Sequence, residues 1–162
     1  MLSQADLTHY QRLTNWLLKA FEQIPKENVH FIQDHEHAIN CIPKNENIVL
    51  TNIDHHHDVL YNKDDIMLNC GNWVRALSDM GVLQRYAWIN NGNSAPYLFE
   101  ENKDIINYTI DLREFNFDTL AIPDVLILCF SPMWIPPAYR PLFFTWMDFF
   151  NHLHGMVCNF ED

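Results

Sequence analysis

Apolar side chains recur at helical spacing in three stretches of the chain. From Leu7 onward an apolar residue returns every three or four positions until Pro25, which predicts an amphipathic helix over about residues 4–23. The same spacing predicts helices over about residues 72–84 and 142–154, the last of them strongly aromatic.

Short runs of β-branched and aromatic residues lie between these helices. The predicted strands cover residues 29–32, 47–53, 86–89, 105–112 and 125–130. Strands that alternate with helices are typical of an α/β protein with a mainly parallel sheet flanked by helices. We find no repeat and no linker, so we expect a single domain over residues 1–162.

Clusters of metal-binding residue types follow two of the strands directly. Residues 54–58 read Asp-His-His-His-Asp after the strand 47–53. In an extended segment alternate residues share a face, so Asp54, His56 and Asp58 would point together. Two carboxylates and an imidazole suit Mn²⁺, Fe²⁺ or Zn²⁺. Because most of these ligand atoms are oxygens, Mn²⁺ is favoured. The alternative is a solvated, histidine-rich loop.

The second cluster, residues 34–37, follows the strand 29–32 and reads Asp-His-Glu-His. Because ligand sites in open α/β sheets lie at the carboxyl ends of strands, a histidine from this cluster is placed to complete the metal site. We favour His35 as that ligand, although these histidines would also fit an ordinary surface turn.

Charge and composition narrow the function classes. The formal net charge is -11, so a phosphate backbone would be repelled and a cationic substrate attracted. Nucleic acid is therefore not an expected partner. No apolar run is long enough to span a membrane and the polar N-terminus does not resemble a signal peptide, so we expect a cytoplasmic protein without a membrane partner. The four cysteines form no C-x-x-C pair and are expected to be reduced thiols.

Four segments together resemble one enzyme family. They read QDHEHA (33–38), NIDHHHD (52–58), CGNW (70–73) and LCFSPMWIPP (128–137). The D-x-H-x-D pattern after a hydrophobic strand resembles a metal motif of the arginase–agmatinase ureohydrolases. The whole set is most similar to a small branch that includes the peptide arginases of ribosomal peptide (RiPP) biosynthesis.

The resemblance implies a three-layer α/β fold and a pair of Mn²⁺ ions that activate water for attack on a guanidinium carbon. Arginine in a precursor peptide would become ornithine with release of urea. On this resemblance Asp54 bridges the metals, His35 and Asp58 hold one ion, and His56 holds the other. Asp111 is the nearest counterpart of a further metal-binding aspartate.

The chain departs from the family at three places. Arg113 stands where a second aspartate of the third motif would be, and Met133 where relatives often place glutamate. Val74 stands where arginases carry a histidine that transfers protons. We therefore take His37 and His57 as the candidate catalytic residues for proton transfer.

Several aromatic and amide side chains near the predicted site are candidates for substrate binding. Aromatic walls at Trp73 and Trp134 would stack on a guanidinium group, although core packing is the commoner fate of tryptophan. Asn72 belongs to the CGNW segment, and Asn90 follows a strand, where it would bind a peptide backbone or form a turn.

Two other functions remain open. Asp54-His55-His56 after a strand is also typical of metal phosphoesterases of the Asp-His-His type, although the earlier D-x-D strand motif of that family is missing. A non-catalytic protein that binds a metal or a peptide would explain Arg113 and Met133. The apolar helix over 142–154 is compatible with a homodimer as well as with ordinary core packing.

Overall fold

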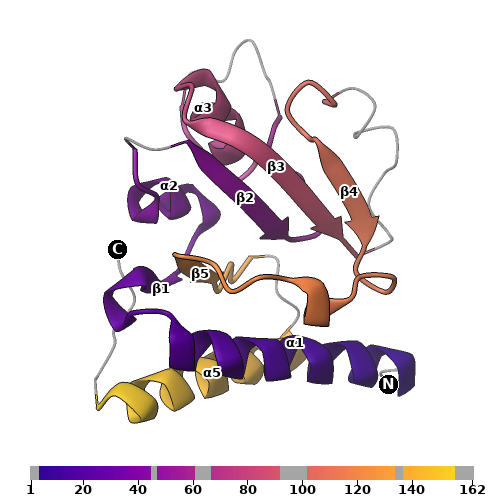
Figure 1. Cartoon of the computed structure of the whole chain (residues 1–162), viewed down its shortest axis with the longest axis vertical. Coiled ribbons are helices and arrows are strands. Elements are labelled where there is room, and N and C mark those ends of the chain that lie inside the picture. Colours follow the sequence, from indigo (N-terminus) through magenta and orange to yellow (C-terminus); the bar gives the residue numbers. More distant parts are fainter. Residues whose placement is uncertain (1–3, 45–46, 61–66, 92–101, 134–136, 156–162) are drawn as a thin grey trace.

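The computed structural model describes residues 4–44, 47–60, 67–91, 102–133 and 137–155, and strands and helices alternate along them. The helices are α1 (Gln4–Gln23), α2 (Ala38–Cys41), α3 (Trp73–Asp79) and α5 (Arg140–His154) (Figure 1). The strands are β1 (Val29–Ile32), β2 (Ile48–Ile53), β3 (Leu83–Asn90), β4 (Tyr108–Asp111) and β5 (Leu126–Cys129).

Every strand pairing in the described residues is parallel. One ladder joins β1 to β5, with Val29 opposite Leu126 and Ile32 opposite Cys129. The other three strands form a second sheet in the order β2-β3-β4. In this sheet Ile53 lies opposite Ile89, and Asn90 lies opposite Asp111. Parallel pairing brings the carboxyl ends of neighbouring strands to one edge, where the polar clusters of the sequence begin.

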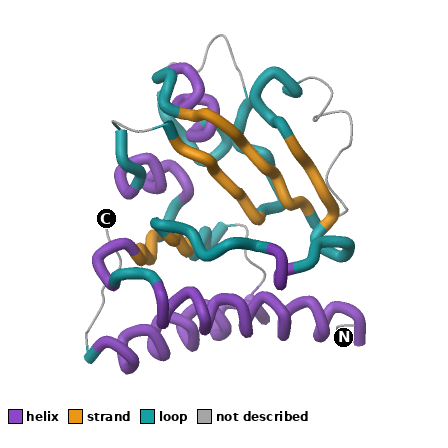
Figure 2. Tube along the Cα trace, viewed as in Figure 1, coloured by secondary structure: helices purple, strands orange, loops and turns teal. Residues whose placement is uncertain are grey.

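Helices cover the strands from two sides, as Figure 2 shows. On one side α1 and α5 pack on β1 and β5 through an aromatic core that includes Phe21, Phe31, Phe143 and Phe150. The Phe21 and Phe150 rings lie 5.2 Å apart between their centroids. On the other side α2 and α3 pack against β3 and β1 through residues that include Trp73, Leu77, Tyr86 and Trp88. The predicted α/β class, with parallel strands flanked by helices, is confirmed, although the described strands form two sheets instead of one.

The predicted helix over 72–84 is shorter than expected. Helix α3 ends at Asp79, and Gly81 follows with φ 71°, a left-handed conformation that glycine adopts without steric cost. The chain reverses there, so β3 begins at Leu83, three residues before the predicted strand. Within the described residues, no helix is both long and apolar enough to cross a membrane.

Candidate metal centre

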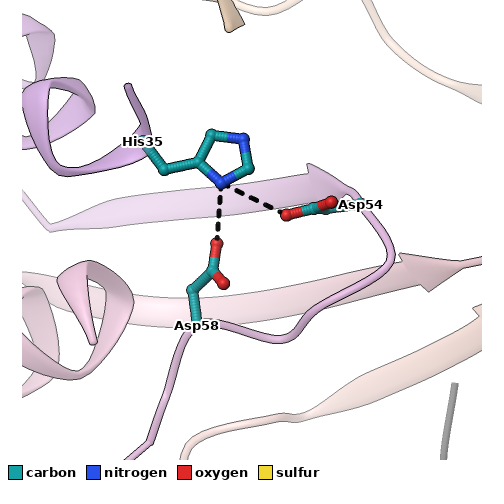
Figure 3. A group of neighbouring side chains, drawn as sticks. All are labelled: His35, Asp54 and Asp58. Carbon is teal, nitrogen blue, oxygen red and sulfur yellow. Dashed lines mark ion pairs between the residues drawn. The ribbon is translucent and has the colours of Figure 1, made fainter. Parts of the chain in front are cut away.

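Three side chains from two separate segments of the chain converge near the carboxyl ends of β1 and β2. His35 Nδ1 lies 3.4 Å from Asp54 Oδ2 and 3.6 Å from Asp58 Oδ2 (Figure 3). One potential ligand atom from each of His35, Asp54 and Asp58 lies within 4.8 Å of the other two. The predicted association of His35 with the 54–58 segment is therefore present in the fold.

The two strands position these residues in different ways. Strand β1 ends at Ile32, and His35 opens a short 3-10 helix, His35–His37. Asp54 follows β2 directly, and its backbone N–H still donates to Ile89 O of β3 at 3.1 Å. The chain then bends over residues 54–56, and Asp58 has φ 55°, a left-handed conformation uncommon outside glycine. This turn brings the Asp58 carboxylate back beside Asp54.

Asp58 is held by the start of α3. Its side chain is 2% exposed, and its Oδ2 accepts a hydrogen bond from the Trp73 indole Nε1 at 2.7 Å. The Asp58 carbonyl accepts from the backbone N–H groups of Val74 (3.1 Å) and Arg75 (3.3 Å). The first turn of a helix has N–H groups without partners inside the helix, and here Asp58 supplies their acceptor.

The electrostatics of the site favour a bound cation. Burial raises the pKa of Asp58 to about 8, and repulsion from Asp54 adds to the rise, while hydrogen bonds from Trp73 and Asn52 oppose it. Asp54 Oδ2 is buried and has no hydrogen-bond partner among the described residues. A divalent cation would supply the missing partner and neutralise the paired carboxylates, so the residues present fit a metal such as Mn²⁺.

His56 lies outside this three-residue group, although the sequence placed it on the same face as Asp54 and Asp58. That expectation assumed an extended backbone, whereas the strand ends at Ile53 and the chain bends. His56 is exposed, and its ring contacts that of His55 at 4.6 Å between centroids. Burial lowers the pKa of His56, and Asp54 opposes that shift. Its role as a ligand remains a prediction.

The two histidines predicted to transfer protons lie in different surroundings. His57 is 2% exposed; its Nδ1 accepts from the Val59 N–H at 3.1 Å, and its ring packs edge-on against Trp88. Burial lowers the pKa of His57, with His56 adding to the effect. His37 ends the 3-10 helix that begins at His35, and its Nδ1 is buried without a hydrogen-bond partner in the described part of the chain. His37 Nδ1 thus accepts no hydrogen bond where His57 Nδ1 does, and the proton-transfer role of both histidines remains a prediction.

Asp111 is engaged by an arginine rather than by the cluster. The Arg113 Nε lies 3.0 Å from both carboxylate oxygens of Asp111, and its Nη2 donates to Oδ2 as well. These hydrogen bonds lower the pKa of Asp111. The geometry provides no support for Asp111 as a ligand, and its metal-binding role remains a prediction.

The predicted substrate-binding residues are mostly occupied with structural contacts. Asn72 binds the turn before α3, accepting from the Asn69 N–H at 2.8 Å and donating to Met67 O at 3.0 Å. Asn90 donates to Thr109 Oγ1 at 3.0 Å. Trp73 is 4% exposed, so its indole faces Asp58 and the core instead of solvent. Trp134 lies outside the described residues.

A polar network behind Asp58 was not foreseen from the sequence. Asn52 Nδ2 lies 3.5 Å from Asp58 Oδ2 and 3.3 Å from the Tyr86 hydroxyl oxygen, and this hydroxyl donates to His57 O at 2.8 Å. Asn52 directly precedes the last residue of β2, which is the only sequence signal for its role. Tyr86 comes from a neighbouring strand, and nothing in its local pattern indicates the contact.

The comparisons with known proteins provide no further identification, since no family model, curated protein or solved structure matches this chain.

Proposed function

We propose that this protein is a metal-dependent hydrolase that uses Mn²⁺ to convert arginine side chains of a peptide to ornithine, with release of urea. The observation that carries the proposal is the convergence of His35, Asp54 and Asp58, in which the buried Asp54 Oδ2 accepts no hydrogen bond within the described residues. The guanidinium substrate rests on the resemblance to peptide arginases. Cys41, Cys70 and Cys129 form no disulfide among the described residues, and reduced thiols are typical of the cytoplasm, which is the compartment that we propose.

The number of ligands favours catalysis over a purely structural metal site. Structural zinc sites are usually closed by four protein ligands, whereas catalytic sites keep a position for water or substrate. Within the described residues the cluster offers three ligands, His35, Asp54 and Asp58, which leaves at least one position open. When bound, the metal would supply a Lewis acid and a nucleophilic water near neutral pH.

The residues of the chain would then have separate tasks. Asp54 and Asp58 hold the cation as carboxylates, and His35 contributes a neutral imidazole nitrogen. His37, two residues along the same 3-10 helix, carries a buried ring nitrogen without a hydrogen-bond partner in the described residues, and it would accept or return a proton. The acidic surroundings and the net charge of -11 favour a cationic guanidinium as substrate.

A direct test uses purified protein, Mn²⁺ and arginine-containing peptides, including peptides in which lysine replaces arginine. We expect mass spectrometry to show the loss of one CH₂N₂ unit per modified arginine, with urea as the second product. Asp54→Asn should abolish the reaction, whereas Asp148→Asn, an exposed position on α5, should not. Unmodified arginine in every peptide, despite bound Mn²⁺, would refute the arginase assignment.

A non-catalytic metal- or peptide-binding protein is the second candidate. The pairing of Asp111 with Arg113 favours it, because an aspartate engaged in this way is not available to a second ion. The side chain of Met133, where relatives carry glutamate, is 85% exposed and provides no charge to anchor a guanidinium. Tight Mn²⁺ binding without turnover of any peptide would favour this function.

A further inference from the structure

The Trp73 indole lies at the point where helix α3 meets the candidate metal centre. Its Nε1 donates to Asp58 Oδ2 at 2.7 Å, and both side chains are almost completely buried. A buried charge-assisted hydrogen bond of this length is among the stronger contacts in a protein. A substrate-facing tryptophan would instead expose its ring, so the contact assigns a different task to this residue.

The backbone around Asp58 fixes its main chain but not its carboxylate. The N–H groups of Val74 and Arg75 bind the Asp58 carbonyl, and the left-handed φ of 55° sets the direction of the side chain. Rotation of the carboxylate about its own bond is still free after these contacts. Among the described residues, that carboxylate accepts hydrogen bonds from Trp73 at 2.7 Å and from Asn52 at 3.5 Å. The indole is therefore the stronger restraint on where the two oxygens point.

We propose that Trp73 is a positioning residue, which sets the affinity of the site for its metal by holding the Asp58 carboxylate toward His35 and Asp54. The proposal rests on the metal site proposed above. Groups that hydrogen-bond to a metal ligand restrict its orientation, and their removal typically weakens metal affinity about 10- to 100-fold. Trp73 thus acts through Asp58 and need not touch the metal or the substrate.

The decisive variant is Trp73→Phe, which keeps an aromatic ring in the core and removes the N–H donor. Trp16→Phe is the matched control. Trp16 is also buried and donates its Nε1 to a backbone oxygen, Leu120 O at 3.1 Å, but it belongs to the α1 side of the molecule. Both variants should lose some stability, because each loses one indole hydrogen bond. Only Trp73→Phe should lose metal affinity.

The measurement is the Kd of Mn²⁺ for each full-length protein, by calorimetry or by electron paramagnetic resonance of free Mn²⁺. We expect the Kd to rise about 10- to 100-fold in Trp73→Phe and to stay unchanged in Trp16→Phe. Wild-type affinity in Trp73→Phe would overturn the positioning role while leaving the metal site intact. No Mn²⁺ binding by the wild type would instead overturn the metal site, and with it this inference.

A second measurement uses the wild type and so does not depend on folding of the variant. Coordination of Asp58 by a diamagnetic ion such as Zn²⁺ changes the charge on the carboxyl group that accepts the hydrogen bond from Trp73. The indole N–H signal of Trp73 in a proton–nitrogen correlation spectrum should therefore move on titration, and that of Trp16 should not. A stationary Trp73 signal in the Zn²⁺-saturated protein would refute the proposal.

Discussion

Asp58→Asn should make the metal-free protein more stable near pH 8 and at the same time abolish its metal binding. The Asp58 carboxylate is 2% exposed and lies beside Asp54, so in the absence of a cation its ionised form is costly. Asparagine has nearly the same shape, keeps an oxygen to accept the Trp73 hydrogen bond, and is neutral at every pH. The substitution therefore removes the charge while changing little else in the core.

The magnitude follows from the pKa of Asp58, which rises from 3.8 to about 8 in the folded protein. Between these two values the folded state holds a proton that the unfolded state has lost, so unfolding becomes easier as the pH rises. The slope approaches about 1.4 kcal/mol per pH unit, and about 4 kcal/mol is lost between about pH 5 and about pH 8. This is a large part of the roughly 5–15 kcal/mol that stabilises an ordinary domain.

The assay is urea unfolding in EDTA at a series of pH values for wild type, Asp58→Asn and the exposed control Asp148→Asn. Wild type and control should lose stability together as the pH rises, and Asp58→Asn should lose less and be the most stable of the three near pH 8. Added Mn²⁺ should stabilise the wild type, increasingly at higher pH, and have no effect on Asp58→Asn. Parallel pH profiles for wild type and Asp58→Asn in EDTA would refute the reasoning.

Three further substitutions test the remaining assignments. Asp54→Ala should eliminate bound Mn²⁺ in elemental analysis, because it removes the buried oxygen that lacks a partner among the described residues; retained metal would contradict the site. Asp111→Asn should leave the metal content unchanged, since its carboxylate is paired with Arg113, and a loss of metal would restore Asp111 as a ligand. His57→Phe should cost about 1–3 kcal/mol in urea unfolding, because the buried Val59 N–H loses its acceptor. Unchanged stability together with lost turnover would favour the catalytic role of His57 instead.

Periodicity was sufficient to predict the first helix and the first strand. The helix over 4–23 coincides with α1, and the strand over 29–32 coincides with β1. The backbone groups of these segments pair within the helix or with one neighbouring strand. Their apolar residues recur at a regular spacing, which can be recognised in the sequence. Ligand sites in parallel sheets lie at the carboxyl ends of the strands. This rule was enough to predict that His35 and Asp54 lie close together, without knowledge of the strand register.

The details of the site depend on contacts that no local pattern contains. The closure of Asp58 onto Asp54 depends on one left-handed residue and on N–H groups at the start of α3, about fifteen residues later in the chain. The hydroxyl of Tyr86 reaches the same region from a neighbouring strand. Contacts between residues so far apart depend on tertiary packing, which cannot be read from local patterns in one sequence.

The histidine run 55–57 shows why residue type alone did not identify the ligands. Three identical side chains in succession have three surroundings: His55 pairs with Asn91 Oδ1 at 3.0 Å, His56 is exposed, and His57 is buried against Trp88. The imidazole in the cluster comes instead from His35, in the 3-10 helix that follows β1. A bend directly after β2 directs the two flanking carboxylates inward and the middle histidine outward. The backbone turn therefore determines which members of the D-H-H-H-D segment can share a cation.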